Sequence, residues 1–499
     1  MKRYLLTVIA LLTVSTLFSQ HFDAVVDRNL WNSGYNRAGL RVDTLSCSYA
    51  EVWGGIERGA LTNHSQSDRS FTAGVKSESI RHFERISFMG ALSFDYFDGK
   101  NMWGSMFMEP GSWLVDIYEY TPGRKVRENY SFTGALSYEI NPKWQVGILA
   151  DFTASNYAKR KDLRHKNTAL DLKFAPSVRW SGAEWSVGAA YIFQKRSESI
   201  KAEEIGVTPD SYHAFFDSGM FYGKESPWTS SDIHLDIAGV DNFPISEQQH
   251  GVELKLGWRE LLLSGEYHFM QGETGEKGVV WHNFDADRWA LNIAWQQRAE
   301  RALHTLRLAM QHSIAHNNEM VIRTETEGGV SNSKSYGEVP IYTEIVSSAS
   351  LEYDLQINKS RLQASVEYLN EEKQSSLLYP YLKEQELSRW LFRVDGVWSL
   401  RCVDIMGGVN FTFGESNYSE RVVAESLPSS GYPERQSRLS EWYDDYMTSP
   451  MVGLNLGIRV NLPKGFYIEP YALYRHGFNL VAVPQSNRVE ATLRVGCRW

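Results

Sequence analysis

The stretch from Tyr130 to Phe152, YSFTGALSYEINPKWQVGILADF, contains two alternating segments on either side of one tight turn. Apolar or small residues recur at every second position, first from Tyr130 to Ile140 and then from Trp144 to Phe152. A period of two is typical of a β-strand with one apolar face. The intervening Asn141-Pro142-Lys143 has the composition of a turn. The stretch therefore predicts an antiparallel hairpin.

The same pattern repeats from residue 44 to the end of the chain and predicts about 18 strands of roughly 10 residues each. The connections between them alternate between short and long. Short turns fall near residues 82, 142, 182, 259, 299, 359, 401 and 464, and long connections fill 57–70, 98–125, 156–166, 197–249, 271–284, 314–342, 371–386, 414–448 and 475–486. A soluble β-sandwich, the alternative, has no reason to place all its long loops at one end. We therefore predict an all-β fold, a transmembrane antiparallel β-barrel with short periplasmic turns and long extracellular loops.

Composition excludes several other classes of protein. The 499 residues include only 3 Cys, which excludes a disulfide scaffold, and 42% hydrophobic residues, which excludes disorder. The net charge of -9 argues against a nucleic-acid partner. The chain has 16 Trp, 26 Tyr and 23 Phe, and most of these rings fall on the apolar strand faces or at their ends. Aromatic rings suit the membrane interface, so outer-membrane lipid is the first predicted partner.

The chain divides into three predicted parts. Met1-Lys2-Arg3 precedes an apolar core from Tyr4 to Phe18, the layout of a secretory signal peptide over residues 1–20. Residues 21–43 are an N-terminal periplasmic or lumen segment, and residues 44–499 are the barrel. The first cysteine is Cys47, so no lipid anchor is expected near the cleavage site. The predicted location is the cell outer membrane.

The last strand, RVEATLRVGCRW from Arg488 to Trp499, alternates apolar residues and ends in an aromatic. It resembles the C-terminal targeting signal of outer-membrane β-barrel proteins. Together with the length and the loop pattern, NLWNSGYNRAGL from Asn29 to Leu40 resembles a Bacteroidetes-type barrel family of uncharacterised function. The resemblance implies a barrel in the outer membrane and no particular functional residue.

Strand alternation predicts which side chains line the lumen. The candidates, which carry both charge signs, are Asp171, Lys173, Glu253, Lys255, Glu266, His268, Arg307, Glu352, Asp354, Arg393, Asp395, Arg459, Glu469 and Arg494. A mixed lining does not form the single-sign ring of a strongly ion-selective pore. It favours a channel or uptake component for a small hydrophilic solute. The alternative is a closed barrel that acts as a surface receptor or as an accessory subunit of an envelope complex.

Two segments are candidates for a constriction. Residues 98–125 have an apolar centre, and residues 21–43 could thread into the lumen; ordinary capping of the barrel ends is the interpretation we favour for both. Cys47 and Cys497 fall on the first and last strands, where we prefer two lipid-facing small residues over a disulfide. No recognisable motif predicts catalytic residues, a metal site or a cofactor, so the chain is not expected to be an enzyme.

Overall fold

The computed structural model describes residue 22 and residues 26–161, 163–203, 213–221, 223–227, 243–276, 279–327, 330–376, 382–421 and 434–499. The predicted signal peptide lies outside these residues. In the described part, no helix is both long enough and apolar enough to cross a membrane.

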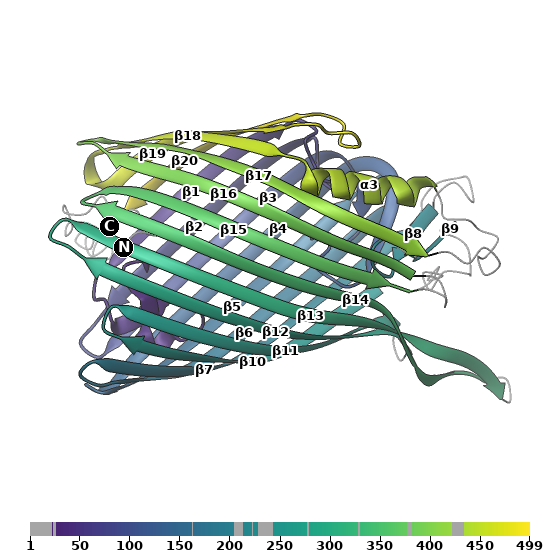
Figure 1. Cartoon of the computed structure of the whole chain (residues 1–499), viewed down its shortest axis with the longest axis horizontal. Helices are drawn as coiled ribbons and strands as arrows, with labels where there is room; N and C mark the ends of the chain where they lie inside the picture. The colour runs from purple at the N-terminus through teal and green to yellow at the C-terminus, as the bar shows by residue number, and fades with distance from the viewer. Residues whose placement is uncertain are drawn as a thin grey trace, which may run out of the picture.

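The wall of the molecule is one closed antiparallel sheet of 18 strands (Figure 1). Two of the 20 strands, β8 and β9, do not belong to the wall. The wall strands are β1 (Cys47–Arg58), β2 (Arg69–His82), β3 (Ile86–Ser105), β4 (Asp116–Asn141), β5 (Trp144–Lys159), β6 (Arg164–Ser181), β7 (Trp185–Glu203), β10 (Phe243–Trp258), β11 (Leu261–Glu276), β12 (Val279–Arg298), β13 (Ala302–Glu327), β14 (Val330–Ile357), β15 (Ser360–Ser375), β16 (Leu382–Ser399), β17 (Val403–Arg421), β18 (Met451–Asn461), β19 (Phe466–Gly477) and β20 (Asn487–Arg498).

The cylinder closes where the first wall strand meets the last. β1 pairs with β20 from Tyr49 opposite Arg498 to Arg58 opposite Val489. Beyond that ladder, the Ser48 N–H donates to the Trp499 carbonyl at 3.1 Å, and the Trp499 N–H donates back at 3.0 Å. A closed sheet leaves no unpaired edge in the wall, as a bilayer requires. The predicted fold class, a transmembrane antiparallel β-barrel, is confirmed.

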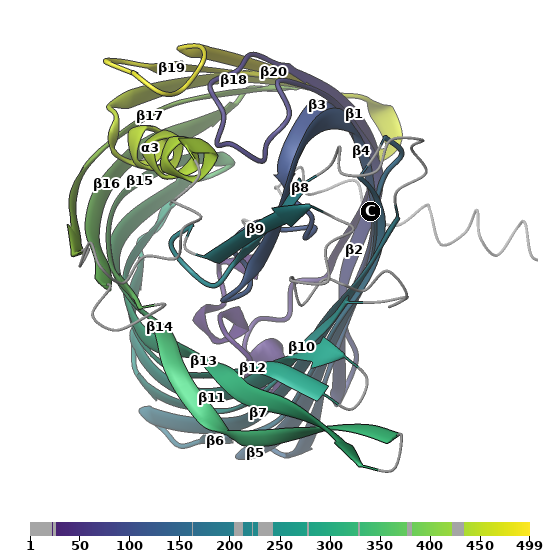
Figure 2. The ribbon, with the colours of Figure 1, turned by 90° about the vertical axis from the view of Figure 1, so that its right-hand side faces the viewer.

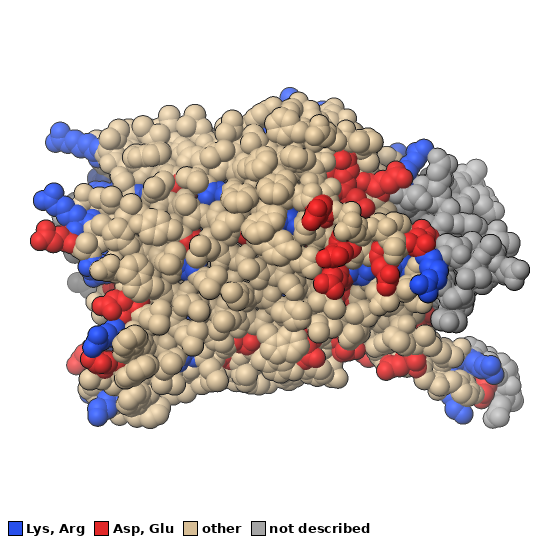
Figure 3. Space-filling view, viewed as in Figure 1, with Lys and Arg blue, Asp and Glu red and all other residues tan. Residues whose placement is uncertain are grey.

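Apolar side chains cover the outer face of the wall. On β10, Val252, Leu254 and Leu256 are exposed, whereas Glu253 and Lys255 between them are buried. The face seen in Figure 3 carries a broad, mostly uncharged zone, and most of its charged side chains gather toward the two ends. This distribution matches a wall that faces lipid, with its polar residues turned inward.

All eight short turns lie where they were predicted, and together they define the short-turn end of the barrel. The opposite, long-loop end differs from the prediction in part. β3 and β4 extend into the predicted loop 98–125, and β13 and β14 run as a hairpin through the predicted loop 314–342 (Figure 1). Beyond the lipid both faces of a strand meet water, so the apolar alternation ends although the backbone pairing continues.

The two cysteines of the first and last strands do not face each other. Cys47 packs beside Phe22 and Ile80 on the inner side, and the Cα partner of Cys497 is Ala50. Val495 and Leu493 place the odd-numbered residues of β20 on the outer face. The prediction of two lipid-facing cysteines is therefore wrong for Cys47. Both are free cysteines, as is Cys402.

Candidate functional site in the barrel lumen

Residues 26–43, here called the plug segment, lie inside the short-turn half of the barrel (Figure 2). The segment contains two short 3-10 helices, η1 (Leu30–Asn32) and η2 (Arg37–Arg41). Each begins after an asparagine whose side chain accepts a hydrogen bond from the first turn: Asn29 from the Trp31 N–H and Asn36 from the Ala38 N–H. Asparagine is a preferred residue at this position. The segment enters the lumen and does not merely cap the end.

A buried ion pair on β10 holds the turn between the two helices. The Glu253 carboxylate accepts from the Asn36 N–H at 2.7 Å and from the Tyr35 N–H at 3.1 Å. It also lies 3.3 Å from the Lys255 ammonium, which donates to the Ser33 carbonyl. Because both side chains are fully buried, separating either from its partner would leave an uncompensated charge. These contacts fix the turn in one position.

Further contacts attach the segment to strands on both sides of the lumen. The Asn36 amide donates to the backbone carbonyls of Val178 at 3.0 Å and Ala189 at 3.1 Å. The Arg179 guanidinium lies 4.5 Å from the Trp31 ring centre, within cation–π range. Across the lumen, Arg361 on β15 donates to the Asp27 carboxylate at 2.8 Å. Polar contacts are therefore joined by apolar burial, since Trp31, Ala38 and Leu40 of the segment are buried.

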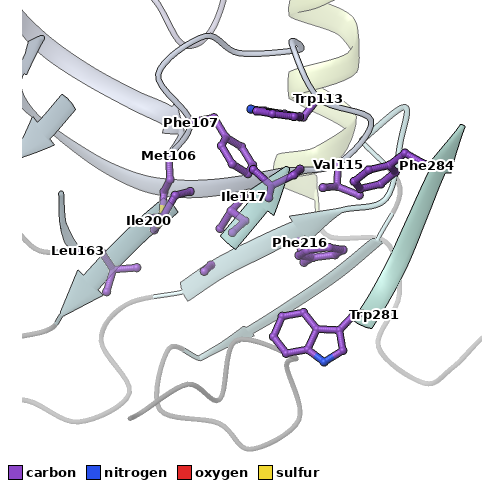
Figure 4. Close-up of a cluster of buried hydrophobic side chains, with 12 residues drawn as sticks. Met106, Phe107, Trp113, Val115, Ile117, Leu163, Ile200, Phe216, Trp281 and Phe284 are labelled. Atoms are coloured by element: carbon purple, nitrogen blue, oxygen red, sulfur yellow. The ribbon is translucent and has the colours of Figure 1, made fainter. Parts of the chain in front are cut away.

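The other predicted constriction also lies inside the barrel, near its long-loop end. Met106, Phe107 and Trp113, from the connection between β3 and β4, belong to a buried apolar cluster that includes Ile200 and Phe284 on the inner wall (Figure 4). The Met108 N–H and the Trp113 indole donate to the Glu198 carboxylate of β7 at 2.9 and 3.3 Å. The interpretation of residues 98–125 as an ordinary cap was therefore wrong. Their apolar centre packs inward because water surrounds the outer side.

A short hairpin completes this inner layer. β8 (His213–Asp217) pairs with β9 (Gly223–Pro227) and, on its other edge, with the first residues of β4 (Figure 2). Next to it, the Glu119 carboxylate lies 3.4 Å from the Lys125 ammonium and accepts a hydrogen bond from Lys159. All three side chains are buried, so this group is part of the packing and is not open to a solute.

Helix α3 (Glu434–Thr448) lies inside the ring of strands at the long-loop end (Figure 2). Within the described residues, one oxygen of Asp445 accepts from three consecutive backbone N–H groups, those of Val481, Ala482 and Val483, at 2.7–2.9 Å. The Trp442 indole donates to the Thr62 carbonyl at 2.7 Å. The helix thus connects the loop between β19 and β20 with the loop between β1 and β2. The sequence pattern did not predict it.

The predicted lumen residues fall into two groups. The first group contacts the plug segment directly or through a neighbour. Lys173 and His268 face the Tyr35 ring, and Glu253 and Lys255 hold the turn of the segment. Arg307 pairs with Glu352 and reaches the Asp27 carbonyl, and Asp354 binds Arg361, which contacts Asp27. Glu266 lies 3.5 Å from His268. Asp171 is an exception, because it lies 3.9 Å from Arg196, whose guanidinium faces the Trp113 ring and not the plug segment.

The second group lies away from the plug segment, on β16 and β18–β20. Glu469 pairs with both Arg459 and Arg494, and this network is largely buried. Arg393 pairs with Asp395 at 3.0 Å and remains exposed. The role of either group in passing a solute stays a prediction.

Sequence reasoning missed the residues that position the inner segments. Asn29 and Asn36 could have been found as helix-capping asparagines in a Gly- and Asn-rich segment. Asp445 carries no such signal, because its backbone donors lie 36 to 38 residues further along the chain. Among the described side chains, no group of three or more His, Cys, Asp or Glu residues is arranged to hold a metal ion.

The fold and its inner segments define a class, a large membrane β-barrel whose lumen contains parts of its own chain. The chain belongs to a family of unknown function (DUF6850), whose model matches residues 38–498. The Bacteroidetes-type origin stays a prediction. A comparison with curated proteins gave no match.

Several solved structures are similar to this chain at low identity. A mutant of the ferric enterobactin receptor PfeA from Pseudomonas aeruginosa has 9% identity and a TM-score of 0.41, over 92% of this chain and 81% of that chain. The ferric-catecholate import receptor Fiu from E. coli K12 has 5% identity and a TM-score of 0.40, over 91% and 81%. The RagAB peptide transporter has 8% identity and a TM-score of 0.43, over 90% and 74%. Likenesses at this level carry no functional information for this chain.

Proposed function

We propose that the chain is an outer-membrane barrel that takes up a small hydrophilic solute, and that the plug segment is its gate at the periplasmic, short-turn end. The observation that supports this proposal most is the kind of contact that holds the segment. Asp27, Tyr35 and Asn36 bind the wall through hydrogen bonds and an ion pair. Water that enters the lumen when the segment moves can hydrate the groups that are freed, which offsets part of the free-energy cost of breaking these contacts. Trp31, Ala38 and Leu40 of the segment are buried as well, so its displacement also exposes apolar surface and the gate is closed at rest.

The polar lumen wall would then become the path of the solute. Acids and bases alternate around the plug segment, so movement of the segment would uncover a lining without one dominant charge sign. Such a lining admits polar solutes without strong ion selectivity. No step of the proposal requires catalysis, a metal or a cofactor.

Conductance in planar bilayers tests the proposal. The full chain should give little steady conductance, whereas a chain lacking residues 29–41 should give discrete steps. A difference in electrophoretic mobility in SDS between unheated and heated samples verifies that each barrel is folded. If the folded, shortened barrel gives no steps, the uptake proposal fails.

The second candidate function is a closed barrel that serves as a surface receptor or as an accessory subunit of an envelope complex. The buried apolar cluster around Phe107 and Trp113 favours it, because burying this much apolar surface makes the long-loop end costly to open. Recovery of one envelope protein in stoichiometric amount with the full chain, together with silent bilayers for both chains, would favour this candidate.

A further inference from the structure

Arg393 is an exposed cation inside the barrel. The odd-numbered residues of β16 face the interior, since Lys383 and Gln385 contact Met220 and Asp444 of the inner segments. The ladder from β16 to β17 continues without a register shift to Arg393. The Arg393 side chain is nevertheless 56% exposed, and that of its ion-pair partner Asp395 is 31% exposed. This part of the lumen is therefore accessible to water.

Two other guanidinium groups of the lumen are less available than that of Arg393, whereas Arg288 on β12 is likewise exposed. Arg361 binds Asp354 with two nitrogens, and its side chain is 18% exposed. Arg459 pairs with Glu469 and is buried. Arg393, in contrast, contacts Asp395 through Nε at 3.0 Å, and in the described structure no hydrogen bond or ion pair within 4 Å engages its two terminal nitrogens.

The neighbours of Arg393 leave room and add negative charge. Its Cα partners on the adjoining strands are Ser365 and Asn410, both small and neutral. Two residues beyond Ser365, on the same face of β15, lies Glu367, which is exposed. The Asp395 carboxylate accepts from the Asn455 amide at 2.9 Å, which fixes its orientation. One guanidinium and two carboxylates thus share one patch of the lumen wall.

We propose that Arg393, Asp395 and Glu367 form a binding site for a small zwitterion that carries one carboxylate and one ammonium group. The free face of a guanidinium matches a carboxylate through two parallel hydrogen bonds. Glu367, which forms no ion pair within 4 Å among the described residues, supplies the complementary site for an ammonium group. Two carboxylates beside one guanidinium repel a dianion such as phosphate. The inference rests on the proposed uptake function, for which it names the solute class.

Calorimetric binding of a dipeptide tests the site. The probes are Ala-Ala, its N-acetyl derivative and its C-terminal amide, each titrated into the full chain and into the chain lacking residues 29–41, both in detergent. Ala-Ala should bind at least one of the two chains, and each blocked derivative should bind at least tenfold more weakly. Equal binding of all three probes, or no binding of Ala-Ala to either chain, would overturn the proposal.

Variants separate this site from other peptide-binding surfaces. Arg393→Gln should weaken Ala-Ala binding at least tenfold, and Glu367→Gln should remove the discrimination against the N-acetyl derivative. Arg401→Gln, in the exposed turn that follows β16, is the matched control and should keep the affinity of the unaltered chain. Unchanged affinity in R393Q would refute the site.

The two proposals fail separately. Dipeptide binding by a chain whose bilayers stay silent would contradict uptake and support the site. Conductance by a chain that binds no dipeptide would support uptake and contradict the site.

Discussion

Gly34 is the residue on which the position of the plug segment depends most directly. Its φ of +66° lies in the left-handed region, and a Cβ at this position would lie 2.0 Å from a Glu253 carboxylate oxygen. The conformation alone costs alanine about 1–2 kcal/mol. We therefore expect Gly34→Ala to raise the population of the displaced segment roughly 5- to 30-fold. Bilayer steps and faster tryptic cleavage at Arg37 and Arg41 would report it.

The matched control is Gly265→Ala on the wall strand β11. A methyl group there meets no atom within 4 Å. This variant should behave as the unaltered chain in both assays. Equal tryptic cleavage of the two variants would contradict the assigned role of Gly34.

Asp217, at the end of β8 and outside the wall, makes the inner hairpin sensitive to pH. Burial raises the pKa of this carboxyl from its ordinary 3.8 to about 7, although hydrogen bonds from the Gly219 and Phe221 N–H groups oppose the shift. The folded state therefore retains a proton that the unfolded state releases near pH 4. The resulting stabilisation is complete below about pH 4 and is lost as the pH rises to about 7.

Hydrogen exchange of residues 213–221, corrected for intrinsic rates, should accordingly show stronger protection at pH 5 than at pH 8. Asp217→Asn should remove the difference. Amides of β12 provide the internal reference. Persistence of the same difference in D217N would assign the effect to another group.

At the scale of elements, the carboxylate of Asp445 attaches helix α3 to the loop between β19 and β20. Hydrogen bonds to a charged group contribute about 1.5–3 kcal/mol each, and Asp445 makes three of them through one oxygen. Asp445→Ala should therefore reduce the protection of residues 438–448 against hydrogen exchange at least tenfold. Glu441→Ala, at an exposed position on the same helix, should leave it unchanged. Equal protection in the two variants would contradict this role of Asp445.

The same helix illustrates which elements the alternation of strand residues could not reveal. Wall strands separate two different media, so their residues alternate in polarity and can be recognised one by one. Helix α3 packs Leu439, Trp442, Tyr443 and Tyr446 inward at helical spacing, but this short stripe lies within a connection between strands, and its partners, Thr62 and Glu371, belong to distant loops and strands. The hairpin of β13 and β14 was read as a loop because its outer part has water on both faces. Elements that lie within a long connection are therefore missed by a search for alternating strands.

For the whole molecule, the strand number, the short turns and the direction of the polar faces could be predicted from residue alternation. The occupation of the lumen could not. The plug segment is recognised by Glu253 and Lys255, which lie more than 200 residues away in the chain. Parity identified these two side chains as inward-facing candidates, but it contained no information on what they bind.

The meeting of β1 with β20 has a consequence for the order in which the molecule is assembled. These strands stand at opposite ends of the chain, so their ladder can form only after all the other wall strands have been synthesised. Until that moment the growing sheet is an open trough. The plug segment can then reach Glu253 and the carbonyls of Val178 and Ala189 from the side, without passing lengthwise through a closed barrel. Once the seam closes, the same residues are enclosed, and leaving requires passage through an end.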